Sequence, residues 1–170
     1  MKKRICIGIG FAIILAIIVF FMYLLRPKLQ SDEENMLYSQ IENIVLDEHQ
    51  EKLQNYKVFL SLKRFGYDIK GDETYIYCWI QTESFFENEE GRVEMYHGSS
   101  MPYKFTFKNG EYVKYDVPKD GREYQQSITE IFPFSVRTKF DKVYEDDYLK
   151  NEFSNQVQES YNIDIEQIYY

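Results

Sequence analysis

Hydrophobic residues fill the first part of the chain without interruption. Residues 5–25 form a run of 21 residues with no charge among them. At about 1.5 Å per residue, a helix of this length extends roughly 31 Å, which is enough to cross a hydrocarbon core of about 30 Å. We therefore expect a transmembrane helix at residues 5–25, with a short stub before it at residues 1–4 and a linker after it at residues 26–30.

A cleaved signal peptide is the alternative, because Lys2, Lys3 and Arg4 also resemble the basic start of such a peptide. The run is longer than the apolar part of a signal peptide, which is about 7–15 residues, and no small-x-small cleavage site follows it. Basic residues are denser on the short amino-terminal side than beyond the run. This bias predicts a single-pass signal anchor in the cell membrane, with a cytoplasmic amino terminus and an extracytoplasmic domain.

From residue 31 the apolar positions follow a helical period. The segment from Ser31 to Glu34 matches a capping box and places acids in the first turn. Apolar residues then recur at helical spacing, at Leu37, Ile41, Ile44 and Val45. This pattern predicts a helix from residue 31 to about residue 50, which Leu53 could extend.

Between residues 57 and 117 the period changes to two, which is typical of strands. The strand at residues 74–81 is apolar on both sides and is therefore expected to be internal in its sheet. The pair Asn109-Gly110 is the strongest hairpin signal in the chain. We expect five strands joined by turns, except that a shaped loop at residues 97–102 joins the third to the fourth. The expected strands lie near residues 57–63, 74–81, 93–96, 103–108 and 111–117.

Helical spacing returns from residue 123. A first helix runs to Pro133, a short turn of helix follows near residues 135–140, and another helix is expected at residues 146–161. The expected inward side chains are Tyr124, Ile128 and Ile131, then Tyr148, Leu149, Phe153 and Val157. We expect a single α+β domain at residues 31–161, with an antiparallel meander covered by helices on one face, and a tail at residues 162–170 that is strand-like at Ile163 and Ile165.

Aromatic side chains line one side of the expected internal strand. Tyr75, Tyr77 and Trp79 alternate there, with Tyr103 or Tyr112 expected opposite them. If helices cover only the other face, these rings form a binding surface or line a pocket. If the carboxy-terminal helices cover this face too, the rings are core. Tyr75, Tyr77, Trp79 and Tyr103 are the candidate ligand or partner face.

Charge and cysteine content restrict the function further. After residue 28 the chain holds 15 basic and 28 acidic residues, a formal charge of −13. Such a domain repels nucleic acid and anionic lipid headgroups. Cys6 lies in the predicted span and Cys78 in an apolar strand, so we expect no internal disulfide and a buried, unreactive Cys78.

No constellation in the sequence predicts catalysis or metal binding. His49 lacks the second histidine that a zinc-peptidase helix presents one turn later. His97 precedes Gly98-Ser99-Ser100, which does not have the spacing of a nucleophile elbow. The acidic clusters at residues 87–90 and 145–147 lack the ligand spacing of a calcium loop. We therefore expect neither an enzyme nor a bound cofactor.

Turn segments in the second half of the chain carry a resemblance. They are Gly98 to Phe105 (GSSMPYKF), Tyr115 to Gly121 (YDVPKDG) and Ile131 to Pro133 (IFP). Residues 65–161 resemble an uncharacterised extracytoplasmic domain of Gram-positive bacteria, found behind a membrane anchor or appended to membrane metallopeptidases of the β-lactam-sensor type. The peptidase part is absent here, so the resemblance carries over no catalytic residue. The order of helix and meander is also similar to cystatin-like and NTF2-like folds.

Together these observations predict a membrane-anchored extracytoplasmic module that is not an enzyme. The leading interpretation is a binding module for a protein or another envelope ligand, within a signalling or regulatory complex. The alternative is a small-ligand pocket protein of the NTF2-like type. The expected partners are the bilayer, through residues 5–25, and an envelope protein, but not nucleic acid. The sequence pattern leaves the oligomeric state and the ligand open.

Overall fold

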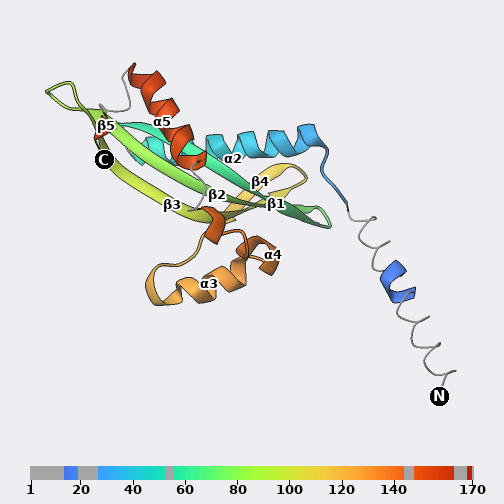
Figure 1. Ribbon diagram of the computed structural model, residues 1–170. Helices are drawn as coiled ribbons and strands as arrows, with labels where there is room; N and C mark the ends of the chain where they lie inside the picture. The colour runs from blue at the N-terminus through green and yellow to red at the C-terminus, as the bar shows by residue number, and fades with distance from the viewer. Residues whose placement is uncertain (1–13, 19–26, 53–55, 144–147, 163–167, 170) are drawn as a thin grey trace. The chain divides into compact units, whose positions relative to one another are not determined.

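The computed structural model describes residues 14–18, 27–52, 56–143, 148–162 and 168–169 (Figure 1). The chain separates into two units, Met1–Ser31 and Asp32–Tyr170. In the first unit, residues 14–18 are helical with exposed side chains. Among the described residues, no helix is both long enough and apolar enough to cross a membrane. Most of the predicted span at residues 5–25 lies outside the described residues, so the anchor stays a prediction.

The second unit begins with the helix that the capping box predicts. Helix α2 covers Ser31–Lys52 and carries Asp32, Glu33 and Glu34 in its first turn. Three of the four side chains at the predicted helical spacing are buried, whereas Ile44 is half-buried. The buried side chains are Leu37, Tyr38, Ile41 and Val45. Leu53, the possible extension, lies outside the described residues. The helix therefore has the acidic first turn and the buried face that its sequence predicts.

Four long strands follow in an antiparallel meander, in the spatial order β1-β2-β3-β4, and a short fifth strand, β5, pairs in parallel with β3 (Figure 1). Strand β2 is internal, as predicted. The strands are β1 (Lys57–Lys70), β2 (Glu73–Glu87), β3 (Val93–Lys108), β4 (Glu111–Asp116) and β5 (Ile168–Tyr169). Asn109 and Gly110 both have positive φ, 52° and 82°, as a two-residue hairpin turn of the mirror-image type requires.

The prediction of a loop at residues 97–102 is wrong, and so is the count of about five strands in the meander. Strand β3 runs without a break through this segment, with Gly98 opposite Glu83 and Pro102 opposite Trp79. Gly98 has no positive φ, so it makes no turn. A proline is tolerated inside a ladder where its nitrogen faces away from the paired strand. Glycine and proline here therefore mark a sheet edge and not a loop.

The remaining helices follow the predicted order. Helix α3 ends before Pro133, with Phe132 as its extended C-cap. Phe153 and Val157 are buried, as predicted, whereas the side chains of Tyr148 and Leu149 and the residues Ile163 and Ile165 lie outside the described part. The elements are η1 (Gly121–Glu123), α3 (Tyr124–Ile131), α4 (Phe134–Arg137), η2 (Asp141–Val143) and α5 (Tyr148–Tyr161).

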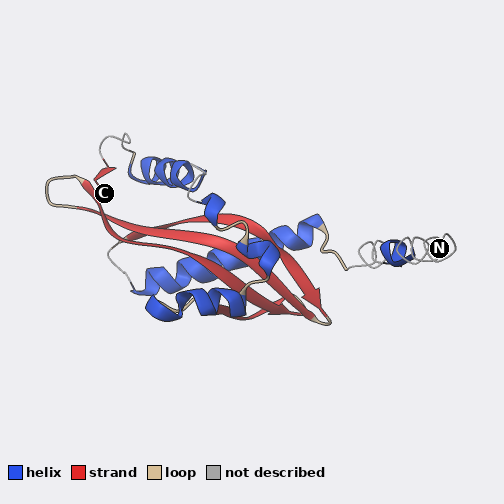
Figure 2. Cartoon of the chain, turned by 60° about the horizontal axis from the view of Figure 1, so that its bottom comes forward, coloured by secondary structure: helices blue, strands red, loops and turns tan. Residues whose placement is uncertain are grey.

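Helices cover both faces of the sheet, so the prediction of one covered face is wrong. On one face, the Tyr115 hydroxyl donates to Glu48 of α2 at 2.8 Å, and the Arg64 guanidinium lies 4.2 Å from the Tyr38 ring centre. Figure 2 shows α2 and α5 on opposite sides of the strands. The opposite face carries two buried clusters, Phe65, Tyr77, Trp79, Ile128, Phe132, Val136 and Val143 near α3 and α4, and Phe59, Phe85, Val93, Phe153 and Val157 under α5.

Candidate functional site

The predicted aromatic row lies on the face that α3 and α4 cover. Tyr77 and Trp79 are buried, with 4% and 2% of their surface exposed, and Tyr75 is half-buried. The Trp79 ring meets Phe140 edge to face at 5.6 Å, and its Nε1 donates to Ser100 Oγ at 2.8 Å. These contacts make Tyr77 and Trp79 part of the core in this region, with Tyr75 at its margin.

Tyr103 lies on the other face of the sheet, contrary to the expectation that it stands opposite the aromatic row. The register pairs Tyr103 with Cys78, whose neighbours Tyr77 and Trp79 point to the opposite side. Tyr103 is buried against Tyr115 at 5.4 Å, and this burial raises its pKa to about 12. Tyr112, the alternative, pairs with Phe107 and belongs to the same ring cluster on the Tyr103 side. The expected aromatic face is therefore divided between the two layers.

Two grooves flank α3 on the face of the aromatic row. One measures about 340 Å³ and lies at the carboxyl end of α3, beside Tyr75 and Tyr77. The other measures about 380 Å³ and has aromatic walls with Arg137 among its lining residues. The Arg137 Nη1 donates to Thr129 Oγ1 at 3.2 Å. The second groove is lined by Trp79, Tyr124, Gln125, Ile128, Arg137, Phe140 and Asp141.

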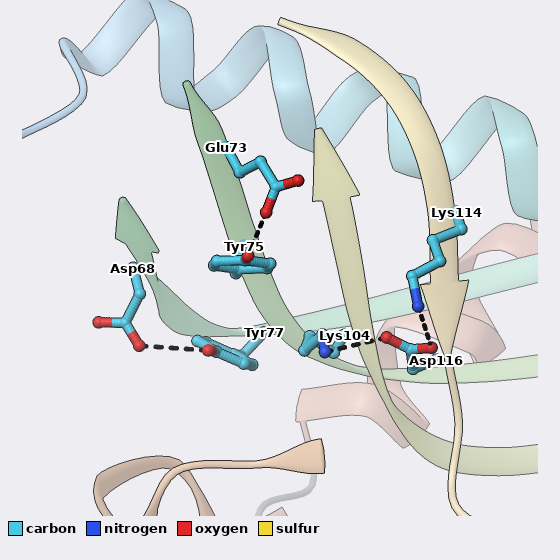
Figure 3. Close-up of polar contacts among 7 residues, drawn as sticks. All are labelled: Asp68, Glu73, Tyr75, Tyr77, Lys104, Lys114 and Asp116. Carbon is cyan, nitrogen blue, oxygen red and sulfur yellow. Dashed lines mark hydrogen bonds and ion pairs between the residues drawn. The ribbon is translucent and has the colours of Figure 1, made fainter. Parts of the chain in front are cut away.

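Polar contacts beside the first groove join β1 to β2 and β3 to β4 (Figure 3), and the Lys104 ammonium group lies 5.5 Å from the centre of the Tyr75 ring on β2. The Tyr75 hydroxyl donates to Glu73, and the Tyr77 hydroxyl donates to Asp68 at 3.2 Å. Burial and the nearby Asp68 charge raise the pKa of Tyr77 above its usual range. Each phenol is thus held protonated by a carboxylate that accepts its hydrogen bond, an arrangement that positions side chains and offers no activated nucleophile.

Asp116 makes the polar contacts on the β4 side. Its carboxylate pairs with Lys104 of β3 and with Lys114 of β4, both at 2.9 Å (Figure 3). Burial alone would raise the pKa of Asp116, but the hydrogen bonds and charges of the two lysines outweigh it and hold the pKa below its usual value. The three charges fasten β4 to β3 where β4 ends.

Strand β3 has an edge that its neighbours cover only at the two ends. Strand β4 pairs with Lys104–Lys108, and β5 pairs only with Val93 and Glu94. The nine residues from Met95 to Tyr103 contain no charged side chain, and no strand pairs with their outer edge among the described residues. Tyr96, His97, Gly98 and Ser100 in this segment are exposed. We call this segment, residues 95–103, the open edge.

A half-buried carboxyl group lies beside the open edge. Glu83 of β2 pairs with Gly98 of β3, and Gln81 Nε2 donates to Glu83 Oε1 at 2.7 Å. The other oxygen, Oε2, is buried and has no hydrogen-bond partner among the described residues. Burial raises the pKa of Glu83 above its usual value, although the hydrogen bond from Gln81 opposes this shift. Such an orphaned acceptor requires a physical explanation.

The residues considered for catalysis are not brought together. His49 Nδ1 lies 2.9 Å from the Val45 carbonyl oxygen at the end of α2, and His97 is exposed on β3. Cys78 is fully buried, and burial raises the pKa of its thiol. Within the described residues, no group of three or more His, Cys, Asp or Glu side chains could hold a metal ion. Residues 145–147 lie outside the described part.

The open edge and Glu83 are features that the sequence reasoning missed. The signal was present, because residues 95–103 are nine residues without a charge, as long as the uncharged run at residues 74–82 of the internal strand. The segment was interpreted as a loop because of Gly98 and Pro102. The orphaned oxygen of Glu83 has no sequence signal, since it depends on packing around that one side chain.

In the comparisons with known proteins, no family model, no curated protein and no solved structure matches the chain.

Proposed function

We propose that the chain is a membrane-anchored binding module that acts outside the cytoplasm, and that its open edge takes up an extended segment of a partner protein as an added strand. In this proposal residues 5–25 form the anchor, and the domain has no catalytic role of its own. The partner is an envelope protein, as the resemblance to Gram-positive extracytoplasmic domains implies, within a signalling or regulatory complex.

The observation that carries the proposal is the open edge itself. An uncovered strand presents a row of backbone N–H and C=O groups that can pair with another chain. Proteins that do not use such an edge cover it or place charges and bulges along it. Residues 95–103 have no charge although 28% of the whole chain is charged, and no strand covers them among the described residues. Their bulge at Tyr96 and their proline, Pro102, lie near the two ends of the segment. Strand addition is a common mode of peptide recognition and suits this edge.

The size of the gap restricts what can pair there. Nine residues in a strand extend roughly 30 Å, and the gap is bounded by β5 at Glu94 and by β4 at Lys104. Strand β3 of a second copy has 16 residues, so an antiparallel pair centred on Ser99 would run into β4 and β5. A short extended segment fits between them. We therefore expect a tail or loop of a partner protein and not a second copy of this sheet.

Strand addition can be tested with peptides. The full-length chain in detergent is used to select binders from a library of random nine-residue peptides, and the best binder is then remade with N-methyl groups at alternate residues. We expect one alternation of N-methyl groups to abolish binding and the other to be tolerated, because a β-strand presents every second N–H to one neighbour. If both forms bind like the parent peptide, strand addition is wrong.

The location is tested separately. A reporter that is active only outside the cytoplasm, fused after Tyr170, should work, and the protein should need detergent for extraction. Activity from a cytoplasmic reporter alone contradicts the orientation. A mature amino terminus near Pro27 would show that residues 5–25 are a signal peptide and not an anchor.

A second candidate function is binding of a small ligand, as in pocket proteins of the NTF2-like type. It is favoured by the groove of about 380 Å³ with aromatic walls, a volume within the usual range of ligand sites. Trp79, the single tryptophan of the chain, lines this groove and reports on it. Binding of an aromatic dye such as anilinonaphthalene sulfonate should change Trp79 fluorescence, and Ile128→Trp should block the dye. Dye binding that ignores this substitution would contradict a ligand site here.

A further inference from the structure

We propose that the segment bound at the open edge carries a lysine or arginine that crosses over Gly98 and forms an ion pair with Glu83. This inference rests on the proposed function of strand addition and names the chemistry of the partner. It assigns Glu83 as a specificity residue, which recognises one position of the incoming strand.

Gly98 of β3 lies beside the Glu83 side chain. It pairs directly with Glu83, so the two side-chain positions lie on the same face of the sheet, the face of α5. A Cβ built at Gly98 would lie 3.7 Å from the Glu83 Cγ. Gly98 itself places no side chain between the open edge and Glu83, and the Met95 sulfur lies at the margin of this position, 3.8 Å from the same Cβ. A residue at this position of any other type would stand between them.

The distance from an added strand to Glu83 restricts which side chains can reach its carboxylate. Neighbouring strands are about 4.8 Å apart, so an added strand on β3 places its residue opposite Gly98 roughly 10 Å from the Glu83 backbone. Lysine and arginine are the side chains long enough to cover this distance across a glycine and carry a positive charge at the end. Shorter residues would leave the carboxylate unpaired. The geometry therefore selects a long basic residue at one register position.

The Glu83 carboxyl group has a hydrogen-bond partner for only one of its two oxygens among the described residues. One oxygen accepts from Gln81, and the other is buried without a partner in the described part of the chain. The ion pairs of the described residues do not include Glu83. A half-buried carboxylate is stabilised by a cation that replaces the lost water. The formal charge of −13 after residue 28 adds a general attraction for a basic segment.

The pairing also fits the backbone directions along β3. Pro102 lies opposite Trp79, and its nitrogen must face away from β2. Backbone groups alternate along a strand, so Gly98 and Ser100 direct their N–H and C=O groups toward the open edge, where Pro102 offers only its carbonyl group. Gly98, the residue that pairs with Glu83, can therefore form backbone hydrogen bonds with an added strand. The same alignment of the added strand allows these hydrogen bonds and the ion pair with Glu83.

The chain itself supplies a first test. In Gly98→Lys the new side chain reaches Glu83 from within the protein, and the ordinary contacts of the Cβ at this position leave room for it. We expect Gly98→Lys to have a melting temperature several degrees above that of the matched variant Gly98→Gln. The difference should disappear when both are made with Glu83→Gln. Equal melting temperatures of Gly98→Lys and Gly98→Gln with Glu83 intact would show that a cation over Gly98 does not pair with Glu83, and would overturn the inference.

The peptide library tests the partner side. Selected nine-residue peptides should be enriched in lysine or arginine at one position, and replacement of that residue by glutamine should weaken binding at least tenfold on the unmodified chain. On Glu83→Gln the same replacement should change binding less than twofold. The control is Glu111→Gln, which removes one exposed acid from β4 and should behave as the unmodified chain does.

The possible results separate the inference from the proposed function. Peptides whose binding depends on alternate N-methylation but that show no basic preference would overturn the ion pair with Glu83 and leave strand addition standing. Peptides with a basic residue whose binding ignores both N-methylation and Glu83→Gln would overturn both, because the attraction would then be general charge. Selection of no peptides at all also overturns both.

Discussion

The outer edges of β1 and β3 belong to one sheet and are treated in opposite ways. On β1, the Leu60 carbonyl accepts from Gln156 at 3.0 Å and the Phe65 carbonyl accepts from Lys139. Strand β1 also has a bulge between Arg64 and Gly66, and five of its 14 residues are charged. The open edge of β3 has no charged side chain. Its contacts include the Tyr56 ring, stacked on Tyr96 at 4.4 Å, and the Ser84 hydroxyl, which donates to the His97 carbonyl at 3.2 Å on the β2 side.

This difference indicates that the β1 edge is protected against pairing with another strand. Charges, bulges and covering groups are the means by which proteins prevent strands from pairing at an edge, and β1 has all three. The β3 edge has only Pro102 and a bulge at Tyr96, the extra residue between the pairs Ser84–His97 and Phe85–Met95, near the two ends of the open edge. A fold that protects one edge so fully and leaves the other open supports a role for the second edge in pairing.

Trp79→Ala should destabilise the whole sheet and affect both edges together. Trp79 lies on β2 opposite Lys63 of β1 and Pro102 of β3, and only 2% of its surface is exposed. Truncation of a buried tryptophan costs about 3–5 kcal/mol, which urea unfolding would measure. The Trp79 fluorescence should be blue-shifted and resist aqueous quenchers. A readily quenched, red-shifted tryptophan in a stable domain would contradict its place in the core.

Opening the β1 edge should cost less. Gln156→Ala and Lys139→Ala each remove the side chain that donates to a β1 carbonyl. The loss of one such hydrogen bond should lower the free energy of unfolding by about 1 kcal/mol. Gln126→Ala, which removes an exposed contact within α3, is the control and should cost about 0.2–0.5 kcal/mol. If all three variants unfold at the same urea concentration as the parent, the β1 edge is not held closed by these contacts.

Glu83→Gln should stabilise the domain at neutral pH. Burial raises the pKa of Glu83 in the folded state, so the folded protein holds this proton more tightly than the unfolded chain does. The charged carboxylate therefore destabilises the fold at pH values above the pKa of Glu83 in the folded protein. This destabilisation decreases as the pH falls toward the pKa of Glu83 in the unfolded chain. The difference between Glu83→Gln and the parent, measured by unfolding from pH 4 to pH 7, should grow as the pH rises.

Asp116→Asn should have the smallest effect and act at the end of the open edge. Its pKa is lowered by Lys104 and Lys114, so the ion pairs contribute stability above the usual pKa of an aspartate and lose it as the pH falls through the lowered value. We expect a loss of about 0.5–1 kcal/mol at pH 7. Faster amide exchange at Lys104–Lys108 would show that β4 loosens and that the open edge lengthens. No change there would place the boundary of the gap elsewhere.

Much of the fold follows from local patterns. The start of α2 at Ser31, the hairpin at Asn109-Gly110, the end of α3 before Pro133 and the internal position of β2 were all predicted, because each depends on a cap, a turn or the polarity of a few neighbours. The candidate site was harder. Tyr75, Tyr77 and Trp79 were placed on one face, whether helices cover them was left open, and the expected position of Tyr103 was wrong. Both questions depend on contacts between distant segments.

By itself the sequence determined where the elements begin and end, how apolar each one is, and that the domain after residue 28 is acidic. The tertiary structure decided which groups those elements leave exposed. It joined two expected strands into β3, because Pro102 could face away from β2. It also placed helices on both faces and left the β3 edge uncovered between β4 and β5. The reason is physical: a side-chain period of two specifies the faces of a strand, whereas the partners of its edges depend on the lengths and registers of other strands.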